Sequence, residues 1–331
     1  MTEREGRIRR FLAEAGWDRA ERGPLAGDAS FRRYDRLRFD DGRRAVLMDA
    51  PPPEEDVRPF LAIRAQLERL NFSAPGLLAA DIGAGLLLLE DLGDDTFTRL
   101  LASGAGEAAL YTLATDVLID LHRRGSAAIP DGLPPYDDER METEALLLTD
   151  WYAPRVTRLA PGAREDYIAL WRDLFPLTRA VPETLVLRDF HVDNLLRLDG
   201  RPGVRACGLL DFQDAVAGPV TYDLMSLLED ARRDIDPALI RRMRARYLDA
   251  FPAIDPAVFD ASWAILAAQR HAKVIGIFTR LCHRDGKPMY LKHIPRVWRL
   301  LEASLTHPGL AGLKHWFDQH LPKNKRGVPQ P

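Results

Sequence analysis

A short polar loop between two apolar runs constrains this chain more than any other feature. Residues 185–187 read LVL, residues 188–194 read RDFHVDN, and the chain becomes apolar again at Leu195 and Leu196. By composition, such a loop could hold a metal ion, carry catalytic groups or form a simple polar turn, because Asp and Asn are common turn formers. The apolar runs on both sides have strand character, so the loop connects two pieces of the core.

The segment that follows supplies another acidic position. Asp199-Gly200 is a turn signal between two runs of strand character, and it predicts a hairpin that folds back on itself. Such a hairpin brings Asp211, in the segment GLLDFQD (208–214), beside Asn194. Protein kinases carry a catalytic Asp, then an Asn, then an Asp at a later strand end, which is the order of Asp189, Asn194 and Asp211 here.

Phosphoryl transfer needs these residue types. The acceptor hydroxyl needs a carboxylate that orients it and takes its proton, the role predicted for Asp189. Mg²⁺ prefers hard oxygen ligands, and Asn194 and Asp211 offer an amide and a carboxylate oxygen. Each residue also has a plain structural interpretation, as a polar turn or, for Asp211, as a helix cap. Their joint occurrence favours catalysis. His191 has no second His at metal-ligand spacing, so zinc is not expected, and Asp193 could face substrate or solvent.

The rest of the chain predicts an α+β fold with two lobes. An Asp-Gly turn at 41–42 predicts a hairpin of residues 30–39 and 44–49. The other elements expected before residue 96 are a helix over 3–17, a helix over 54–70 and a buried strand over 83–90. Helices are expected over 110–121, 143–158 and 163–174, with three or four more between residue 214 and residue 319.

This order corresponds to a small antiparallel β-rich lobe and a large, mostly helical lobe. We expect the first, over residues 1–92, to bind nucleotide, and the second, over 93–321, to hold the catalytic loop and the acceptor site. Residues 322–331, PKNKRGVPQP, are expected to be disordered.

Charge and composition exclude several classes of partner. The formal net charge is −3 with both signs mixed, which gives no reason to expect a nucleic-acid-binding protein. No apolar run is long enough to span a membrane, and the first residues lack the apolar core of a signal peptide. Two cysteines, Cys207 and Cys282, are too few for a disulfide framework. We therefore expect a cytoplasmic protein with no membrane anchor, no nucleic-acid partner and no obligate protein partner.

The loop motifs resemble those of the aminoglycoside phosphotransferase/choline kinase family, whose members have a protein-kinase-like fold. The loop of that family usually reads H-G-D-x-H-x-x-N, followed by I-D-[FW]-x-x-A and by a D-L-A segment. Asp189, Asn194 and Asp211 stand at matching positions, whereas Leu187 and Arg188 replace the usual His and Gly. The resemblance covers nearly the whole chain.

Asp223 matches the D-L-A segment of this family. It is expected to be structural, either as a buried carboxylate that accepts backbone N–H bonds from the catalytic loop or as a helix cap.

Longer segments are similar to the bacterial N-acetylmuramate/N-acetylglucosamine kinases of cell-wall recycling. These segments are GDASFRRY (27–34), VLMDAPPP (46–53), LLDFQDAVAGPVTYD (209–223) and QRHAKVIGIFTRLCHRDGKPMYL (269–291). The resemblance implies an ATP- and Mg²⁺-dependent kinase that phosphorylates the anomeric C1 hydroxyl of an amino sugar, and whose product feeds UDP-sugar synthesis.

One expected residue is missing. Kinases usually hold the α- and β-phosphates with a Lys on the third strand. At that place, in AVLMD (45–49), this chain has Met48 and no Lys. Arg32 and Arg33 are candidates for the replacement, because Arg binds phosphate bidentately. Alternatively, both simply project into solvent from a strand edge.

Two further places are expected to contact the nucleotide. Gly27 and Ser30 belong to the expected phosphate loop, although a lone glycine indicates only a turn. Glu90 and Leu92 lie in the expected hinge, whose backbone would bind the adenine by analogy with the fold.

The acceptor is expected to be neutral or anionic. Residues 263–299 are strongly basic, with Asp285 as their sole acid, which disfavours a cationic aminoglycoside or choline. N-acetylmuramate carries a lactyl carboxylate that Arg284 or Lys287 could pair with, unless these residues form a solvated basic surface.

Three other residues are candidates for contact with the small-molecule sugar. Trp151 and Arg155 could form a platform for the sugar ring, although Trp151 could equally belong to the core, and Asp214 is a further candidate. Two alternatives to an amino-sugar kinase stay open: a kinase of the same family for another hydroxyl acceptor such as an aminoglycoside, choline or homoserine, and a pseudokinase-like module that only binds nucleotide. The missing Lys motivates the second, and the presence of all three loop residues argues against it.

Overall fold

The chain forms two compact units. The computed structural model describes residues 2–25 and 31–330. The first unit comprises Met1–Val117 and Val192–Asp214, and the second comprises Leu118–His191 and Ala215–Pro331. This division does not coincide with the lobes expected over 1–92 and 93–321, because a later segment, Val192–Asp214, belongs to the first unit. The assignment of nucleotide and acceptor binding to the two lobes stays a prediction.

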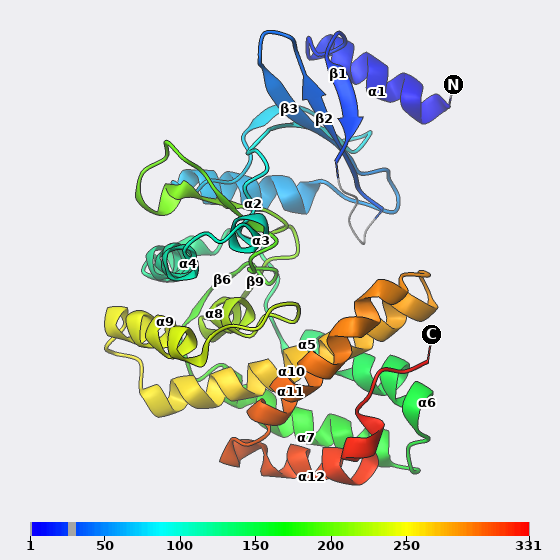
Figure 1. Cartoon of the computed structure of the whole chain (residues 1–331), viewed down its shortest axis with the longest axis vertical. Helices are drawn as coiled ribbons and strands as arrows, with labels where there is room; N and C mark the ends of the chain where they lie inside the picture. Colours follow the sequence, from blue (N-terminus) through cyan, green and yellow to red (C-terminus); the bar gives the residue numbers. More distant parts are fainter. Residues whose placement is uncertain (1, 26–30, 331) are drawn as a thin grey trace. The chain divides into compact units, whose positions relative to one another are not determined.

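An antiparallel sheet forms the frame of the first unit (Figure 1). Its strands are β1 (Glu21–Pro24), β2 (Arg33–Arg38), β3 (Arg44–Asp49), β4 (Leu77–Asp81) and β5 (Leu86–Glu90), in the order β1-β2-β3-β5-β4. The predicted hairpin is present, with Arg38 paired to Arg44 around the Asp-Gly turn. The sequence did not locate β1 or β4, because both are edge strands whose side chains are mostly exposed and lack an apolar pattern.

One face of this sheet is covered by α1 (Glu3–Glu14). Its apolar residues Ile8, Phe11 and Leu12 pack against side chains of β2, β3 and β5, among them Leu37 and Leu47. Because side chains alternate along a strand, Arg36 and Met48 project from the opposite face.

The remaining elements of the first unit connect the sheet to the polar loop. They are α2 (Arg58–Arg69), α3 (Phe97–Ala102), most of α4 (Glu107–His122), β7 (Leu195–Arg197) and β8 (Cys207–Leu209). Phe60 of α2 stacks on Phe212, with ring centroids 5.0 Å apart. Strands β7 and β8 form the antiparallel hairpin that the Asp199-Gly200 turn predicts.

The second unit is built around one long helix, α10 (Pro256–His283), most of whose residues are buried. Figure 1 shows it running beside α11 (Ile294–Ser304). The other elements are α5 (Asp138–Leu147), α6 (Ala153–Val156), α7 (Ala163–Thr178), α8 (Thr221–Leu228), α9 (Pro237–Ala250), α12 (Ala311–His320) and the antiparallel pair β6 (Glu183–Val186) and β9 (Val216–Pro219). No helix within the described ranges is long and apolar enough to cross a membrane.

Two expectations for helices need correction. The structure describes five α-helices after residue 220 instead of three or four, because only a short 3-10 turn separates α11 from α12. The helix expected over 143–158 is α5, a π-helical turn over Leu148–Tyr152 and α6. A Cβ on Gly276 of α10 would stand 2.3 Å from the carbonyl oxygen of Leu147, so the close approach of α10 to the end of α5 requires glycine.

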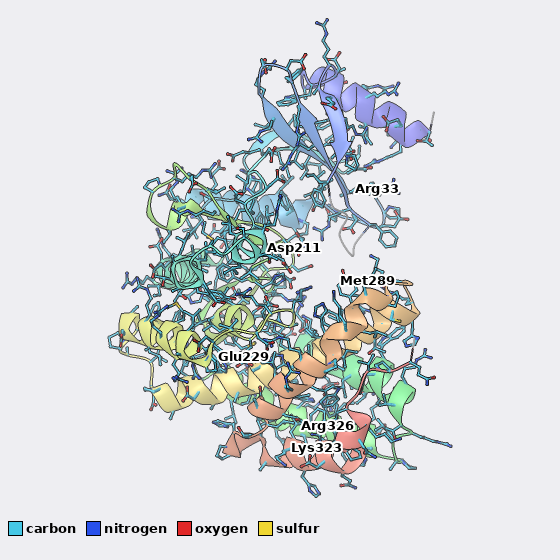
Figure 2. The ribbon with its side chains drawn as sticks, in the orientation of Figure 1. Arg33, Asp211, Glu229, Met289, Lys323 and Arg326 are labelled. Atoms are coloured by element: carbon cyan, nitrogen blue, oxygen red, sulfur yellow. The ribbon has the colours of Figure 1, made fainter. Side chains whose placement is uncertain are left out.

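The expectation of a disordered tail is also wrong for residues 322–330. Arg326 is buried, and its guanidinium pairs with Glu302 and Asp318 at 2.7 Å each, beside α12 (Figure 2). The Tyr152 hydroxyl lies 2.8 Å from the carbonyl oxygen of Lys325. The polar composition of this segment suggested disorder. The segment is ordered because of ion pairs with distant helices, which a sequence pattern does not reveal.

Candidate active site

The hairpin of the first unit brings Asn194 and Asp211 together, as the sequence predicted. Asn194 precedes β7, Asp211 follows β8, and the N–H of Leu210 donates to the carbonyl of Asn194 at 3.0 Å. The Asn194 amide nitrogen lies 3.2 Å from Asp211 Oδ2, and Gln213 Nε2 donates to Asp211 Oδ1 at 2.9 Å. Figure 2 labels Asp211. An amide and a carboxylate are therefore held side by side at the open end of the hairpin.

This pair fits a magnesium ion. Asp211 has a left-handed backbone with φ of 59°, which costs a non-glycine residue about 1–2 kcal/mol, and its side chain keeps 30% exposure. Mg²⁺ usually takes one or two protein ligands and completes its octahedron with phosphates and water. In the described part of the chain no three His, Cys, Asp or Glu residues cluster as a closed metal site. The donor set thus suits a nucleotide-associated ion better than a structural one.

Arg32 lies next to the same carboxylate. Its Nη2 is 3.9 Å from Asp211 Oδ1, and its Nε is 3.5 Å from Glu55 Oε2, just before α2. By contrast, Arg33 is exposed at the start of β2 (Figure 2) and pairs in register with Asp49. Of the two candidate arginines, Arg32 is therefore the one that lies beside Asp211. Gly27 and Ser30, of the expected phosphate loop, lie outside the described residues.

The expected hinge follows β5. The Glu90 carboxylate accepts the N–H of Gly76 at 3.1 Å and pairs with Arg201. Among the described residues, the backbone N–H and C=O of Leu92 make no hydrogen bond, so both remain available for a ligand such as adenine. Arg36 donates to the carbonyl of Gly93 at 3.2 Å. Sequence reasoning missed Arg36, because an arginine within a strand gives no sign that its side chain bonds the hinge.

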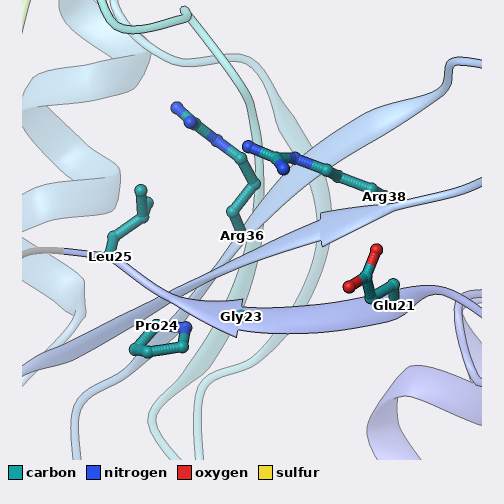
Figure 3. Close-up of a pocket in the computed structure, with 6 residues that line it drawn as sticks. All are labelled: Glu21, Gly23, Pro24, Leu25, Arg36 and Arg38. Atoms are coloured by element: carbon teal, nitrogen blue, oxygen red, sulfur yellow. The ribbon is translucent and has the colours of Figure 1, made fainter.

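Arg36 anchors this segment to the sheet and also lines a pocket. It bonds Asp94 Oδ2 at 2.8 Å and Asp91 Oδ1 at 3.0 Å. Burial alone would lower its pKa, but the hydrogen bonds and charges of these two carboxylates raise it above its usual value. The pocket, of about 160 Å³, is lined by Glu21, Gly23, Pro24, Leu25, Arg36 and Arg38. Figure 3 shows the two guanidinium side chains extending on the same side of β2.

The second unit holds Asp189. Its partly buried carboxyl follows β6, and its backbone N–H donates to the carbonyl of Leu187 at 2.8 Å. The buried carboxylate of Asp223, in α8, accepts the N–H of Leu187 at 2.6 Å and the N–H of Arg188 at 2.9 Å. These are the contacts that the sequence expected of a structural carboxylate. Burial raises the pKa of Asp223 to about 7, against the lowering effect of the two N–H groups.

Arg188 stands where the resembling family usually has glycine, and its backbone keeps a conformation that suits glycine. Its φ of 68° is left-handed, a conformation that favours glycine. The side chain compensates by an ion pair with the buried carboxylate of Glu144 in α5. Burial lowers the pKa of Arg188, but the charge of Glu144 outweighs it and keeps the guanidinium protonated. The loop in this chain is therefore fastened by a side chain that a glycine could not provide.

Glu144 is the centre of a buried network. Tyr136 donates its hydroxyl to Glu144 Oε2 at 2.6 Å, Lys273 Nζ donates to Oε1 at 2.9 Å, and Gln269 donates to Oε2 at 3.1 Å. Burial would raise its pKa, but the charges of Lys273 and Arg188 lower it to about 2. Sequence reasoning missed Glu144. The only available signal was a glutamate on the otherwise apolar face of a helix.

The other loop residues have structural surroundings. His191 is buried, and its pKa is lowered by burial and by the charge of Arg232. Asp193 accepts a hydrogen bond from the hydroxyl of Thr98.

The candidate acceptor residues belong to both units. Arg284 is exposed and pairs with its neighbour Asp285 at 2.7 Å, and the N–H of Lys287 closes the end of α10 on the carbonyl of Leu281. Arg155 is exposed on α6, and its charge adds to burial in lowering the pKa of His283. Trp151 is partly buried in the π-helical turn, and Asp214, of the first unit, is exposed. Their roles in binding sugar stay predictions.

Comparison with known proteins gives these features a family context. The model of a family described as "Phosphotransferase enzyme family" matches residues 21–261. The N-acetylmuramate/N-acetylglucosamine kinase of Caulobacter vibrioides is 36% identical, over 98% of this chain and 99% of its own length. The protein of the same name from Pseudomonas aeruginosa is 39% identical, over 92% of this chain and 90% of its own length.

A solved structure extends the likeness to the fold. The choline/ethanolamine kinase family protein from Mesorhizobium loti superimposes with a TM-score of 0.61 over 96% of this chain and 99% of that chain, at 14% sequence identity. At this identity the likeness concerns the fold alone. The α+β, protein-kinase-like fold that the sequence predicted is confirmed.

Proposed function

Because this chain belongs to the phosphotransferase enzyme family, we propose that it transfers the γ-phosphoryl group of ATP to an amino sugar, N-acetylmuramate or N-acetylglucosamine. The observation that carries the proposal is the pairing of Asn194 with Asp211 at 3.2 Å in a chain of 36–39% identity to kinases of that name. Such kinases use ATP and a divalent metal ion.

The first unit supplies the groups for Mg·ATP in this proposal. Asn194 and Asp211 would hold the ion, which neutralises the charge of the β- and γ-phosphates when bound. Arg32 takes the place of the missing third-strand Lys, and Glu55 orients it as the acidic partner of that Lys does in protein kinases. Support comes from the position of Arg32 between Glu55 and Asp211.

The nucleotide base has a candidate site in the same unit. The backbone groups of Leu92 in the hinge make no hydrogen bond within the described ranges, and Arg36 fixes this segment while lining a pocket. The backbone around Glu90 and Leu92 therefore binds the adenine in this proposal. Gly27 and Ser30 remain proposed contacts of the phosphates.

The second unit supplies the general base of the proposed reaction. Asp189 orients the acceptor hydroxyl and takes its proton, a role expected to contribute about 10²–10⁴ in rate. Asp223 positions the loop through two backbone N–H groups. We propose that the acceptor is the anomeric C1 hydroxyl, and that the reaction belongs to peptidoglycan recycling in the cytoplasm, where ATP is available. The small-molecule sugar is the only partner proposed.

A panel of acceptors tests the proposal. Release of ADP from Mg·ATP is measured with N-acetylmuramate, N-acetylglucosamine, choline, homoserine and kanamycin, and Asp189→Asn serves as the inactive control. We expect the two amino sugars to stimulate release. Stimulation by choline, homoserine or kanamycin alone would indicate another acceptor, and binding of ATP without any stimulation would indicate a pseudokinase-like module.

A further inference from the structure

A buried arginine of the second unit lacks a counter-ion among the residues that the structure describes. Arg270 lies on α10 and is only 6% exposed. Its Nη1 is buried without a hydrogen-bond partner, and within the described part of the chain it forms no ion pair. A buried guanidinium without a counter-ion is costly, because its lost hydration is not replaced. Asp230, only 1% exposed, likewise has a buried Oδ2 with no hydrogen-bond partner among the described residues.

The neighbours of Arg270 on the helix define where its side chain points. Gln269 Nε2 bonds Glu144 in α5, and His271 Nε2 bonds Glu229, which follows α8 and is labelled in Figure 2. Successive residues of an α-helix are turned by about 100°. Arg270 therefore points between the Glu144 side and the Glu229 side of α10. Glu144 holds Arg188, and Glu229 precedes Asp230 in the chain.

The surrounding charges agree with this direction. The imidazole of His191 has its pKa lowered mainly by burial and by Arg232, while the charges of Asp230, Asp189 and Arg270 also act on it. Arg270 also acts on the carboxyl of Asp223, which holds the loop of Asp189. The unpartnered guanidinium thus belongs to the surroundings of the proposed base, within the same unit.

We propose that Arg270 binds the carboxylate of the acceptor sugar and thereby distinguishes N-acetylmuramate from N-acetylglucosamine, while Asp230 accepts a hydrogen bond from a hydroxyl that both sugars carry. This inference rests on the proposed function, since the two sugars differ by the lactyl carboxylate. A carboxylate gives Arg270 the missing counter-ion, and bidentate binding suits a guanidinium.

Lys273, Arg188 and Arg284 are less suitable for this role. Lys273 and Arg188 already neutralise Glu144. Arg284 lies beyond the end of α10, about 20 Å along the helix from Arg270, and is paired with Asp285.

The ratio of kcat/KM for N-acetylmuramate to that for N-acetylglucosamine tests this inference. We expect Arg270→Gln to lower the ratio about 10- to 100-fold, because one charged hydrogen bond to the transition state is lost. The activity on N-acetylglucosamine and the KM for ATP should be retained. Arg270→Lys should restore part of the ratio. Arg172→Gln, which removes an exposed arginine paired with Glu142, is the matched control and should leave the ratio unchanged.

Asp230→Asn completes the test, since it should raise the KM for both sugars alike. Equal loss on both sugars in Arg270→Gln, an unchanged ratio, or a selective loss in Arg284→Gln instead, would overturn the inference while the proposed function stands. If Arg270→Gln does not fold, the same comparison is made with Arg270→Lys, whose ratio must then fall. A wild-type protein that phosphorylates neither sugar overturns the proposed function and the inference with it.

Discussion

The buried carboxylate of Glu144 is expected to stabilise the second unit strongly, and Glu144→Gln tests this. Gln keeps the shape of the side chain and can still accept the hydroxyl of Tyr136. It removes the charge that neutralises Arg188 and Lys273, which keep only 12% and 14% side-chain exposure. Two cations then remain buried without a counter-ion, which is costly in a poorly solvated environment.

The magnitude follows from the pKa of Glu144, which is lowered from 4.5 to about 2. This difference between the unfolded and folded chain corresponds to about 3 kcal/mol of folding free energy at neutral pH. Because the folded-state pKa is the lowered one, the contribution is complete above the unfolded pKa near 4.5. It is lost as the pH falls from there toward 2.

Urea unfolding followed by tryptophan fluorescence measures this effect, because all tryptophans except Trp17 belong to the second unit. We expect Glu144→Gln to lose about 3 kcal/mol at pH 7.5 and the same amount at pH 5.5. Glu142→Gln is the matched control on the same helix. Its partner Arg172 is 64% exposed, so a loss below about 0.5 kcal/mol is expected.

Two results would refute this reasoning. A loss in Glu144→Gln as small as that in Glu142→Gln would mean that the carboxylate is not a stabilising centre. A loss that grows as the pH falls from 7.5 to 5.5 would mean that the pKa of Glu144 is raised rather than lowered in the folded protein.

Three further predictions concern other parts of the molecule. Asp189→Asn should lower kcat by about 10²–10⁴ without changing the affinity for ATP measured by titration calorimetry; weaker ATP binding would instead indicate a nucleotide contact. Arg32→Ala should raise the KM for ATP about tenfold and Arg33→Ala should not, and equal effects of the two would remove the assignment of Arg32 as the phosphate-binding cation. Deleting residues 322–331 should lower the melting temperature by about 2–4 °C, because the ion pairs of Arg326 are lost; an unchanged melting temperature would show that these contacts do not stabilise the fold.

The loop and its hairpin were predictable because their signals are local. The Asp199-Gly200 turn and the apolar runs beside it determine the pairing of β7 with β8, and this pairing places Asp211 next to Asn194. Similarly, the apolar side of α1 indicated an amphipathic helix before its place on the sheet was known.

The support of the loop was not predictable, because it depends on residues far apart in sequence. Glu144 precedes Arg188 by 44 residues and belongs to helix α5, whereas Arg188 lies in the loop after β6. The left-handed backbone of Arg188 could likewise not be predicted, because arginine seldom adopts this conformation. Sequence reasoning thus located the chemical groups but not the side chains that hold them.

The central claim is phosphorylation of an amino sugar at its anomeric hydroxyl, and the reducing end of the product tests it most directly. The protein is incubated with Mg·ATP and N-acetylmuramate or N-acetylglucosamine, and released ADP is compared with the reducing sugar that remains. The account predicts that one reducing end disappears for each ADP formed. ADP released while the reducing end persists would place the phosphate on another hydroxyl and contradict the account, as would the absence of sugar-dependent ADP.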